Sequence, residues 1–366
     1  MNRYTRLSTT QWLRAFAVVL SVIIFSSFSF QSTAFAGPYI TVDAGSGRVI
    51  NHDQAFQKWY PASITKIMTA YLAFKAVKSG RLSMKSMVTM SKYAASKPAS
   101  KMYFKPGTQF TLDSGLKFLL VKSANDVAVA IAETISGSEQ AFVNLMNREA
   151  RRIGMISTRF ANPNGLPGGT QYTTARDLAV LAVTVRREFP RYQSYFSLEG
   201  FSTGKKKYTN YNLLLGRFAG ANGMKTGFIC ASGFNLVGSA TRGGKSIITV
   251  VLGAKSQEAR AELAAELLQA GFRGKRTNAK LSTLQPYGAT RNQLANIRNQ
   301  ICTKEARAAR YDGRDVEGKM VLKSPYIKAM RREPRVVSAP FSAVVAASAK
   351  LPRSRNVPIP APRPKR

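Results

Sequence analysis

Apolar side chains recur with a helical period in several parts of the chain. In residues 64–77 the apolar positions lie near the 3.6-residue repeat of an α-helix. The same pattern predicts helices over residues 141–153, 175–187 and 257–270. A further helical run, residues 116–135, is interrupted around Ser123-Ala124-Asn125.

Shorter apolar segments have the features of strands. Residues 39–43 and 48–51 flank the turn-forming sequence Gly45-Ser46-Gly47 and are typical of a β-hairpin. Three later segments are also predicted to be strands: residues 224–226, 234–240 and 246–252. The order of a hairpin, a helical middle, further strands and a final helix predicts a helix-covered sheet with strands from both chain ends.

The first 36 residues have the pattern of a signal peptide. Three arginines and no acidic residue precede the uncharged, mostly apolar residues 15–30, and Ala34-Phe35-Ala36 has the small-x-small form of a cleavage site. Cleavage is therefore expected after Ala36. A retained membrane anchor is the alternative, but the apolar run is short for a spanning helix. Either way, the body is expected to be exported to the periplasm or cell envelope.

Composition and charge narrow the class of partner. The 366 residues carry 55 Lys and Arg against 18 Asp and Glu, a formal net charge of +37, and 45% of them are hydrophobic. This hydrophobic share is sufficient for a core and excludes wholesale disorder. The charge indicates a polyanionic partner. Export argues against nucleic acid and favours an anionic membrane or cell-wall surface.

Positive charge is concentrated near the C-terminus. Residues 37–272 hold 30 basic and 13 acidic residues, whereas the 94 residues of 273–366 hold 22 basic and 5 acidic ones. This tail ends in the Pro-rich residues 357–364 and is predicted to be largely extended or disordered. We expect it to associate peripherally with anionic lipid or cell wall; a solvated tail without a partner is the alternative.

The scarcity of histidine and cysteine limits the chemistry. A Ser-His-Asp triad would need His52, the single histidine, which is expected to be a surface residue at a strand end. One histidine and two cysteines are too few for the usual zinc sites, and no metal or cofactor is expected. Export permits a disulfide between Cys230 and Cys302, and two buried free thiols are the alternative.

The first candidate for chemistry is Ser63-Ile64-Thr65-Lys66, which opens the first predicted helix. Positions i and i+3 share a helical face, so the serine hydroxyl and the lysine amine are neighbours. A buried lysine near a helix N-terminus can lose its proton and activate a serine. The alternative is an N-cap serine with a solvated lysine. Ser202-Thr203-Gly204-Lys205 has the same spacing but precedes no apolar helix, and we treat it as a coincidence.

A second candidate, Ser123-Ala124-Asn125, interrupts a helical run, which would direct polar side chains into a cleft. A serine there can relay a proton, and an asparagine can hold a substrate amide. The alternative is an ordinary polar loop, as for Ser354-Arg355-Asn356 in the tail.

The third candidate is Lys225-Thr226-Gly227, on a predicted strand. The glycine would let a substrate peptide approach and pair along the strand, and the lysine and threonine would bind a carboxylate. The alternative is a strand that ends in a turn.

Taken in order, the three motifs resemble those of penicillin-binding proteins and class A β-lactamases. Over residues 38–272 the chain resembles the D-alanyl-D-alanine carboxypeptidase family, the low-molecular-mass penicillin-binding proteins. The similarity lies in residues 60–66, 123–126, 162–166 and 223–228. It implies the β-lactamase/transpeptidase-like fold, an α/β (α+β) architecture whose antiparallel sheet is covered by helices and joined to a helical subdomain. Residues 37–272 would then be the catalytic domain.

The resemblance implies three catalytic residues. Ser63 would attack the D-Ala-D-Ala amide and form an acyl-enzyme, Lys66 would be the general base, and Ser123 would relay protons. The backbone N–H groups of Ser63 and Phe228 would form the oxyanion hole.

A substrate-binding set is implied in the same way: Asn125, Lys225, Thr226, Gly227 and Phe228. In this set Asn125 orients the substrate amide, and Lys225 and Thr226 hold the terminal carboxylate. Arg260, in the last predicted helix, is either an extra carboxylate partner or a surface arginine.

The function implied is removal of the terminal D-alanine from peptidoglycan stem peptides, with β-lactams as covalent inhibitors. A class A β-lactamase would need a loop glutamate, but the only acid between Glu149 and Glu188 is Asp177, in the first turn of a predicted helix. A transpeptidase is an alternative because only the acceptor differs. A non-catalytic envelope-binding relative is another, against which the intact Ser63 and Lys66 argue.

Overall fold

The computed structural model describes residues 37–168, 170–204, 206–274, 278–311 and 320–342. The expected signal peptide and the last 24 residues of the tail lie outside the described residues. Within the described ranges, no helix is both long enough and apolar enough to cross a bilayer.

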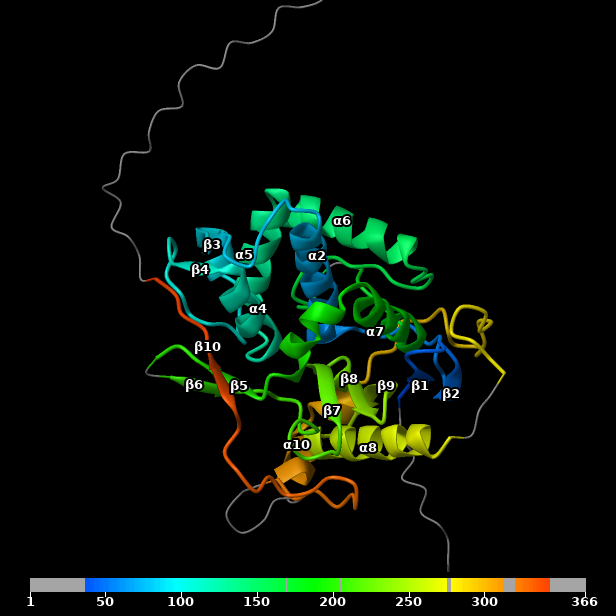
Figure 1. Cartoon of the computed structure of the whole chain (residues 1–366). Helices are drawn as coiled ribbons and strands as arrows, with labels where there is room; N and C mark the ends of the chain where they lie inside the picture. Colours follow the sequence, from blue (N-terminus) through cyan, green and yellow to red (C-terminus); the bar gives the residue numbers. More distant parts are fainter. Residues whose placement is uncertain (1–36, 169, 205, 275–277, 312–319, 343–366) are drawn as a thin grey trace, which may run out of the picture. The chain divides into compact units, whose positions relative to one another are not determined.

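The body is built on a five-stranded antiparallel sheet in the order β2-β1-β9-β8-β7 (Figure 1). Its strands are β1 (Tyr39–Asp43), β2 (Val49–Asp53), β7 (Ala221–Ile229), β8 (Gly233–Arg242) and β9 (Lys245–Ala254). β1 pairs with β9, where Ile40 lies opposite Val250. The sheet therefore takes strands from both ends of the body, as the sequence predicted.

Both faces of this sheet are covered by helices. In β9, Ile248 belongs to the main hydrophobic core, whereas the neighbouring Ile247 lies against Gly271 of α8 (Gln257–Arg273). Successive strand residues point to opposite faces, so both faces are apolar and buried. α7 (Ala175–Glu188) packs against β1 and β9.

A helical subdomain is built around α2 (Lys66–Lys78), most of whose residues are buried. Its other elements are β3 (Met87–Thr89), α3 (Lys92–Ala95), β4 (Gln109–Thr111), α4 (Leu112–Leu120), α5 (Asn125–Ser136) and α6 (Glu139–Arg152). The helical run predicted for residues 116–135 spans the end of α4 and most of α5, and the break lies at Ser123, whose φ of 62° is left-handed. This break confirms the interruption inferred from the sequence.

Several short elements were not predicted. Besides β3, α3 and β4, they include η1 (Ala62–Thr65), η2 (Pro190–Ser197), β5 (Gly200–Ser202) and β6 (Lys207–Thr209). Ser202 lies in the hairpin of β5 and β6, where its hydroxyl donates to the Gly204 carbonyl. This local role fits the interpretation of the second Ser-x-x-Lys sequence as a coincidence.

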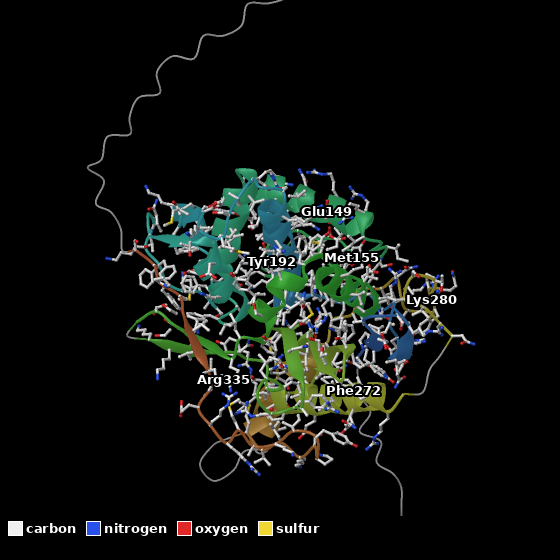
Figure 2. The ribbon with its side chains drawn as sticks, in the orientation of Figure 1. Glu149, Met155, Tyr192, Phe272, Lys280 and Arg335 are labelled. Carbon is white, nitrogen blue, oxygen red and sulfur yellow. A yellow bond between two sulfur atoms is a disulfide. The ribbon has the colours of Figure 1, made fainter. Side chains whose placement is uncertain are left out.

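The described parts of the tail differ from the expected disordered segment. Residues 278–311 and 320–342 lie on the body, and Figure 2 labels Lys280 and Arg335 within them. They contain α9 (Arg298–Ile301), α10 (Lys304–Tyr311) and β10 (Val336–Ser338), a parallel neighbour of β5. Their buried side chains include Leu281, Ile297, Ile301 and Ile327. These apolar residues are few and most lie far apart, so they give no sustained periodic pattern, which is why the sequence suggested disorder.

The tail also determines the surroundings of Cys230 and His52. Cys230 and Cys302 form a disulfide, which decides between the two alternatives left by the sequence. His52 lies on β2 but is half-buried, because the Tyr287 hydroxyl lies 2.6 Å from its Nδ1. The strand position is confirmed, whereas the expected surface position is wrong because the tail covers it.

Candidate active site

Ser63 and Lys66 lie where η1 passes into α2. Pro61 precedes this turn, and Lys66 is the first residue of α2. The Lys66 side chain is fully buried, and its Nζ lies 2.9 Å from Ser63 Oγ. The spacing of three residues therefore places the amine beside the hydroxyl, as the sequence predicted.

Two further oxygens hold the Lys66 amine. Nζ lies 2.7 Å from Asn125 Oδ1 and 2.7 Å from the carbonyl oxygen of Asn164. Burial lowers the pKa of Lys66 well below its usual value, and the nearby Lys225 ammonium lowers it further, although Asp126 acts in the opposite direction. A neutral amine with two N–H groups bound to these oxygens can accept the Ser63 proton through its lone pair.

Asn125 also contacts the base directly. Its Oδ1 accepts from Lys66, and its Nδ2 donates to the Pro98 carbonyl at 2.9 Å. One of the two N–H groups on Nδ2 takes no part in these bonds, and the residue lines the pocket. Asn125 therefore positions Lys66, and its contact with a substrate amide stays a prediction.

The second and third motifs meet at a buried ammonium. Lys225 Nζ donates to Ser123 Oγ at 3.0 Å and to the Thr226 carbonyl at 2.8 Å. Burial, with the Arg260 guanidinium nearby, lowers the pKa of Lys225 to about 7. Lys225 is 1% exposed and does not line the pocket. Its ammonium acts on the pocket through the bond to Ser123, which does line it.

The strand β7 passes close to the nucleophile. A Cβ on Gly227 would lie 3.0 Å from the backbone nitrogen of Ser63, closer than nearly all Cβ contacts. Only glycine allows this approach without a shift of the backbone. Thr226, Gly227 and Phe228 consequently line the pocket beside Ser63.

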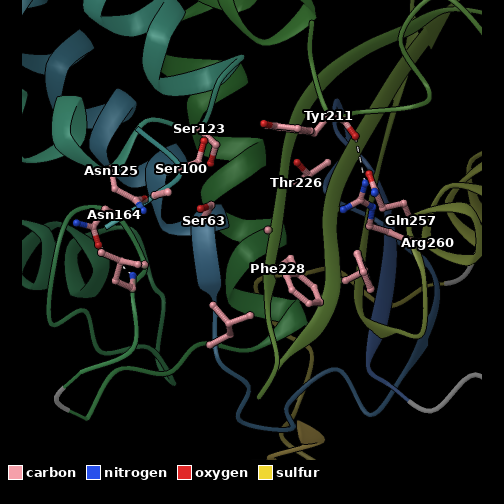
Figure 3. Close-up of a pocket in the computed structure, with 16 residues that line it drawn as sticks. Ser63, Ser100, Ser123, Asn125, Asn164, Tyr211, Thr226, Phe228, Gln257 and Arg260 are labelled. Carbon is pink, nitrogen blue, oxygen red and sulfur yellow. Dashed lines mark hydrogen bonds between the residues drawn. The ribbon is translucent and has the colours of Figure 1, made fainter. Parts of the chain in front are cut away.

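These residues surround one pocket of about 360 Å³. Figure 3 shows Asn125 and Asn164 on one side of it and Thr226, Phe228 and Arg260 on the other, with Ser63 between them. All of the predicted site residues are brought together here, with Lys66 and Lys225 buried behind the wall.

A loop over the pocket depends on Asp126, the residue after the second motif. Both carboxylate oxygens accept from the backbone nitrogen of Met102, and one also accepts from that of Tyr103. The backbone nitrogen of Asn125 donates to the Ser100 carbonyl at 2.8 Å. These bonds hold Ser100 in the pocket wall, a position that no sequence motif indicated.

Sequence reasoning also missed the role of Asn164 and left the position of Arg260 open. Asn164 acts through its backbone carbonyl, for which side-chain patterns give no signal beyond the resemblance of residues 162–166. Arg260 is only 3% exposed, lines the pocket and donates to the Tyr211 carbonyl at 3.1 Å. The surface interpretation of Arg260 is therefore wrong, because this residue lies on the buried side of α8. Burial lowers its pKa to about 10.

A family model described as D-alanyl-D-alanine carboxypeptidase matches residues 27–256. The chain is 36% identical over 265 residues to the D-alanyl-D-alanine carboxypeptidase DacC of Escherichia coli (strain K12). That match covers 67% of this chain and 66% of the relative, so it spans about two thirds of the relative's length.

The chain is also similar to solved structures of penicillin-binding proteins. Penicillin binding protein 5 from Haemophilus influenzae is 35% identical with a TM-score of 0.63, and the match covers 65% of this chain and 71% of that one. Penicillin-Binding Protein D2 from Listeria monocytogenes, in its ampicillin-bound form, is 28% identical with a TM-score of 0.59. The match covers 64% of this chain and 96% of the Listeria chain.

Proposed function

Because the chain belongs to the D-alanyl-D-alanine carboxypeptidase family, we propose that it removes the terminal D-alanine of peptidoglycan pentapeptides through an acyl-enzyme on Ser63. One observation carries this proposal. The buried Lys66 amine lies 2.9 Å from Ser63 Oγ, and its pKa is well below the ordinary value of lysine. This gives the serine a base in a site that contains no histidine.

In the acylation step, neutral Lys66 takes the Ser63 proton while Oγ bonds to the carbonyl carbon of the scissile amide. The backbone N–H groups of Ser63 and Phe228 stabilise the oxyanion; β7 is an edge strand and carries Phe228 past the nucleophile. The proton passes to the leaving nitrogen through Lys66 and Ser123, and the C–N bond breaks. Water then hydrolyses the ester and releases Ser63.

The terminal carboxylate of the substrate would lie between Ser123, Thr226 and Arg260. All three line the pocket, and Lys225 donates to Ser123 from behind. Cationic and hydroxyl donors around one carboxylate favour a C-terminal residue over an internal peptide bond. This arrangement accounts for exopeptidase rather than endopeptidase activity.

β-Lactams would acylate the same serine by opening their ring, as the ampicillin-bound relative suggests. Slow release is expected because Asp177, the only acid between residues 149 and 188, is not placed to activate water. Its carboxylate is buried and accepts from Ser157, Thr158 and Arg176. The pocket is lined by other residues.

The enzyme would act outside the cytoplasmic membrane, after removal of residues 1–36. The basic tail would hold it peripherally on anionic lipid or cell wall through charge. Sedimentation with anionic liposomes and with isolated cell walls, at low and high salt, tests the tail; binding that is insensitive to salt would contradict a purely electrostatic contact.

The activity is tested by following D-alanine release from a pentapeptide and labelling by a fluorescent penicillin. Wild type should do both, and Ser63→Ala should do neither. Ser202→Ala is the matched control, because it changes the serine of the coincidental Ser-x-x-Lys sequence, and it should behave as wild type. Equal labelling of wild type and Ser63→Ala would refute the acyl-enzyme. Transfer to an added amino acid acceptor that exceeds hydrolysis would indicate a transpeptidase.

A further inference from the structure

One segment of the tail is fixed against the end of the substrate pocket. Cys230 directly follows β7 and is bonded to Cys302 in the tail. The Ile297 backbone nitrogen donates to the Ala231 carbonyl at 3.0 Å, and the Ile301 side chain is buried. This segment lies beyond residue 256, where the match to the family model ends. Residues outside the matched region therefore pack against the end of β7, whose residues 226–229 line the pocket.

Arg310, in α10 of this segment, reaches the pocket wall. Its guanidinium lies over the ring of Phe234, 5.6 Å from the centroid, and donates one N–H to the Ile301 carbonyl. Phe234 lines the pocket and contacts the ring of Phe228, with centroids 4.3 Å apart. Phe228 is 41% exposed, so a peptide in the pocket can lie on this aromatic pair. Figure 3 shows Phe228 on the same side of the pocket as Arg260.

A second cation also contacts Phe234. The Arg260 guanidinium lies 6.0 Å from the same ring centroid. Among the described residues, no acidic side chain forms an ion pair with Arg310. An anion is favoured beside a cation that lacks an acidic partner, so this end of the pocket is suited to a carboxylate.

We propose that Arg310 determines substrate specificity by binding a carboxylate on the residue that precedes the D-Ala-D-Ala of the stem peptide. This rests on the proposed function. The terminal carboxylate is placed deeper, at Thr226 and Arg260, whereas Arg310 approaches from the tail side of the aromatic pair. It would therefore meet a second acidic group, carried on a side chain. The disulfide keeps α10 in position for this contact.

The test uses two peptides that end in D-Ala-D-Ala and differ only in the preceding side chain, a carboxylate in one and its carboxamide in the other. Wild type should prefer the carboxylate. Arg310→Ala should lower kcat/KM for the acidic peptide about 10-fold, the scale of one charge-assisted contact, and leave the amide peptide within about 2-fold. Arg310→Lys should retain part of the preference, because it keeps the charge without the planar fork.

Arg307→Ala is the matched control, since Arg307 is an exposed arginine of the same helix, and it should keep the wild-type preference. Cys302→Ser, which frees the segment, should lose the preference as Arg310→Ala does. Equal kcat/KM for the two peptides in wild type, or an equal fall for both in Arg310→Ala, would overturn the proposal. A failure of the proposed function would give a different result: wild type would release no D-alanine from either peptide.

Discussion

The position of Gly165 allows a sharp test of how the base is held. Gly165 has a φ of 82°, and a Cβ there would lie 1.8 Å from the carbonyl oxygen of Ala62. Ala62 directly precedes the nucleophile, and Asn164 supplies the carbonyl that binds Lys66. Gly165→Ala therefore forces the loop of residues 162–166 away from the turn that carries Ser63.

The size of the effect follows from these distances. Ordinary contact begins at 3.4 Å, so the loop must retreat by about 1.6 Å. The 2.7 Å bond from Lys66 Nζ to the Asn164 carbonyl would then exceed hydrogen-bond length. A displacement of about 1 Å at a reacting group can cost about 100-fold in rate. We expect Gly165→Ala to lower the acylation rate by at least that factor.

The control is Gly154→Ala. Gly154 has nearly the same conformation, with a φ of 84°, but a Cβ there meets open space. Both variants share the strain of a left-handed alanine, about 1 kcal/mol, and only Gly165→Ala collides with the active-site turn. Stopped-flow acylation by a fluorescent penicillin, with thermal unfolding of each variant, separates rate from stability. If the two variants acylate within about 3-fold of each other, the loop does not position Lys66.

Three further outcomes are expected. Lys66→Met should keep the fold but lower penicillin acylation by about 100-fold to 10,000-fold, as for loss of a general base, and near-normal labelling would contradict this role. The Lys225 ammonium, with a pKa of about 7, is present below that pH and lost above it. Because it supports carboxylate binding, kcat/KM for the pentapeptide should fall as pH rises through about 7, and Lys225→Met should remove that limb of the pH profile. Cys302→Ser should lower the free energy of unfolding by up to about 4 kcal/mol, since the disulfide spans 72 residues, and an unchanged denaturant midpoint would show that the tail is held without it.

The sequence predicted those parts of the fold in which hydrophobic residues recur at a regular spacing along the chain. The hydrophobic face of residues 64–77 appears as α2, and the polar interruption at Ser123 appears as the gap between α4 and α5. The strands β1 and β2 flank the turn-forming Gly45-Ser46-Gly47, so their hairpin could also be predicted. The pairing of β1 with β9 required a topological argument, because 200 residues of chain separate the two strands.

The remaining features have no local signal. A backbone carbonyl such as that of Asn164 carries no side-chain information, and its contact with Lys66 depends on how a distant loop folds back. Arg260 seemed to be a surface residue because arginine usually is, and only the packing of α8 shows that it is buried. The tail was misjudged for a related reason. Its composition is that of a disordered segment, but a few apolar residues and one disulfide fix it on a surface that the body provides.

The two buried lysines explain how one site keeps a neutral base and a cation together. Lys66 and Lys225 are both withdrawn from water, which disfavours the charged form of each. Lys66 also carries the repulsion of Lys225, and its neutral form is satisfied by two oxygen acceptors and the Ser63 hydroxyl. Within the described ranges, Lys225 donates to the Thr226 carbonyl and the Ser123 hydroxyl, and a substrate carboxylate would favour its charged form. Substrate binding would therefore fix the proton on Lys225, and its charge would keep Lys66 neutral when the amide arrives.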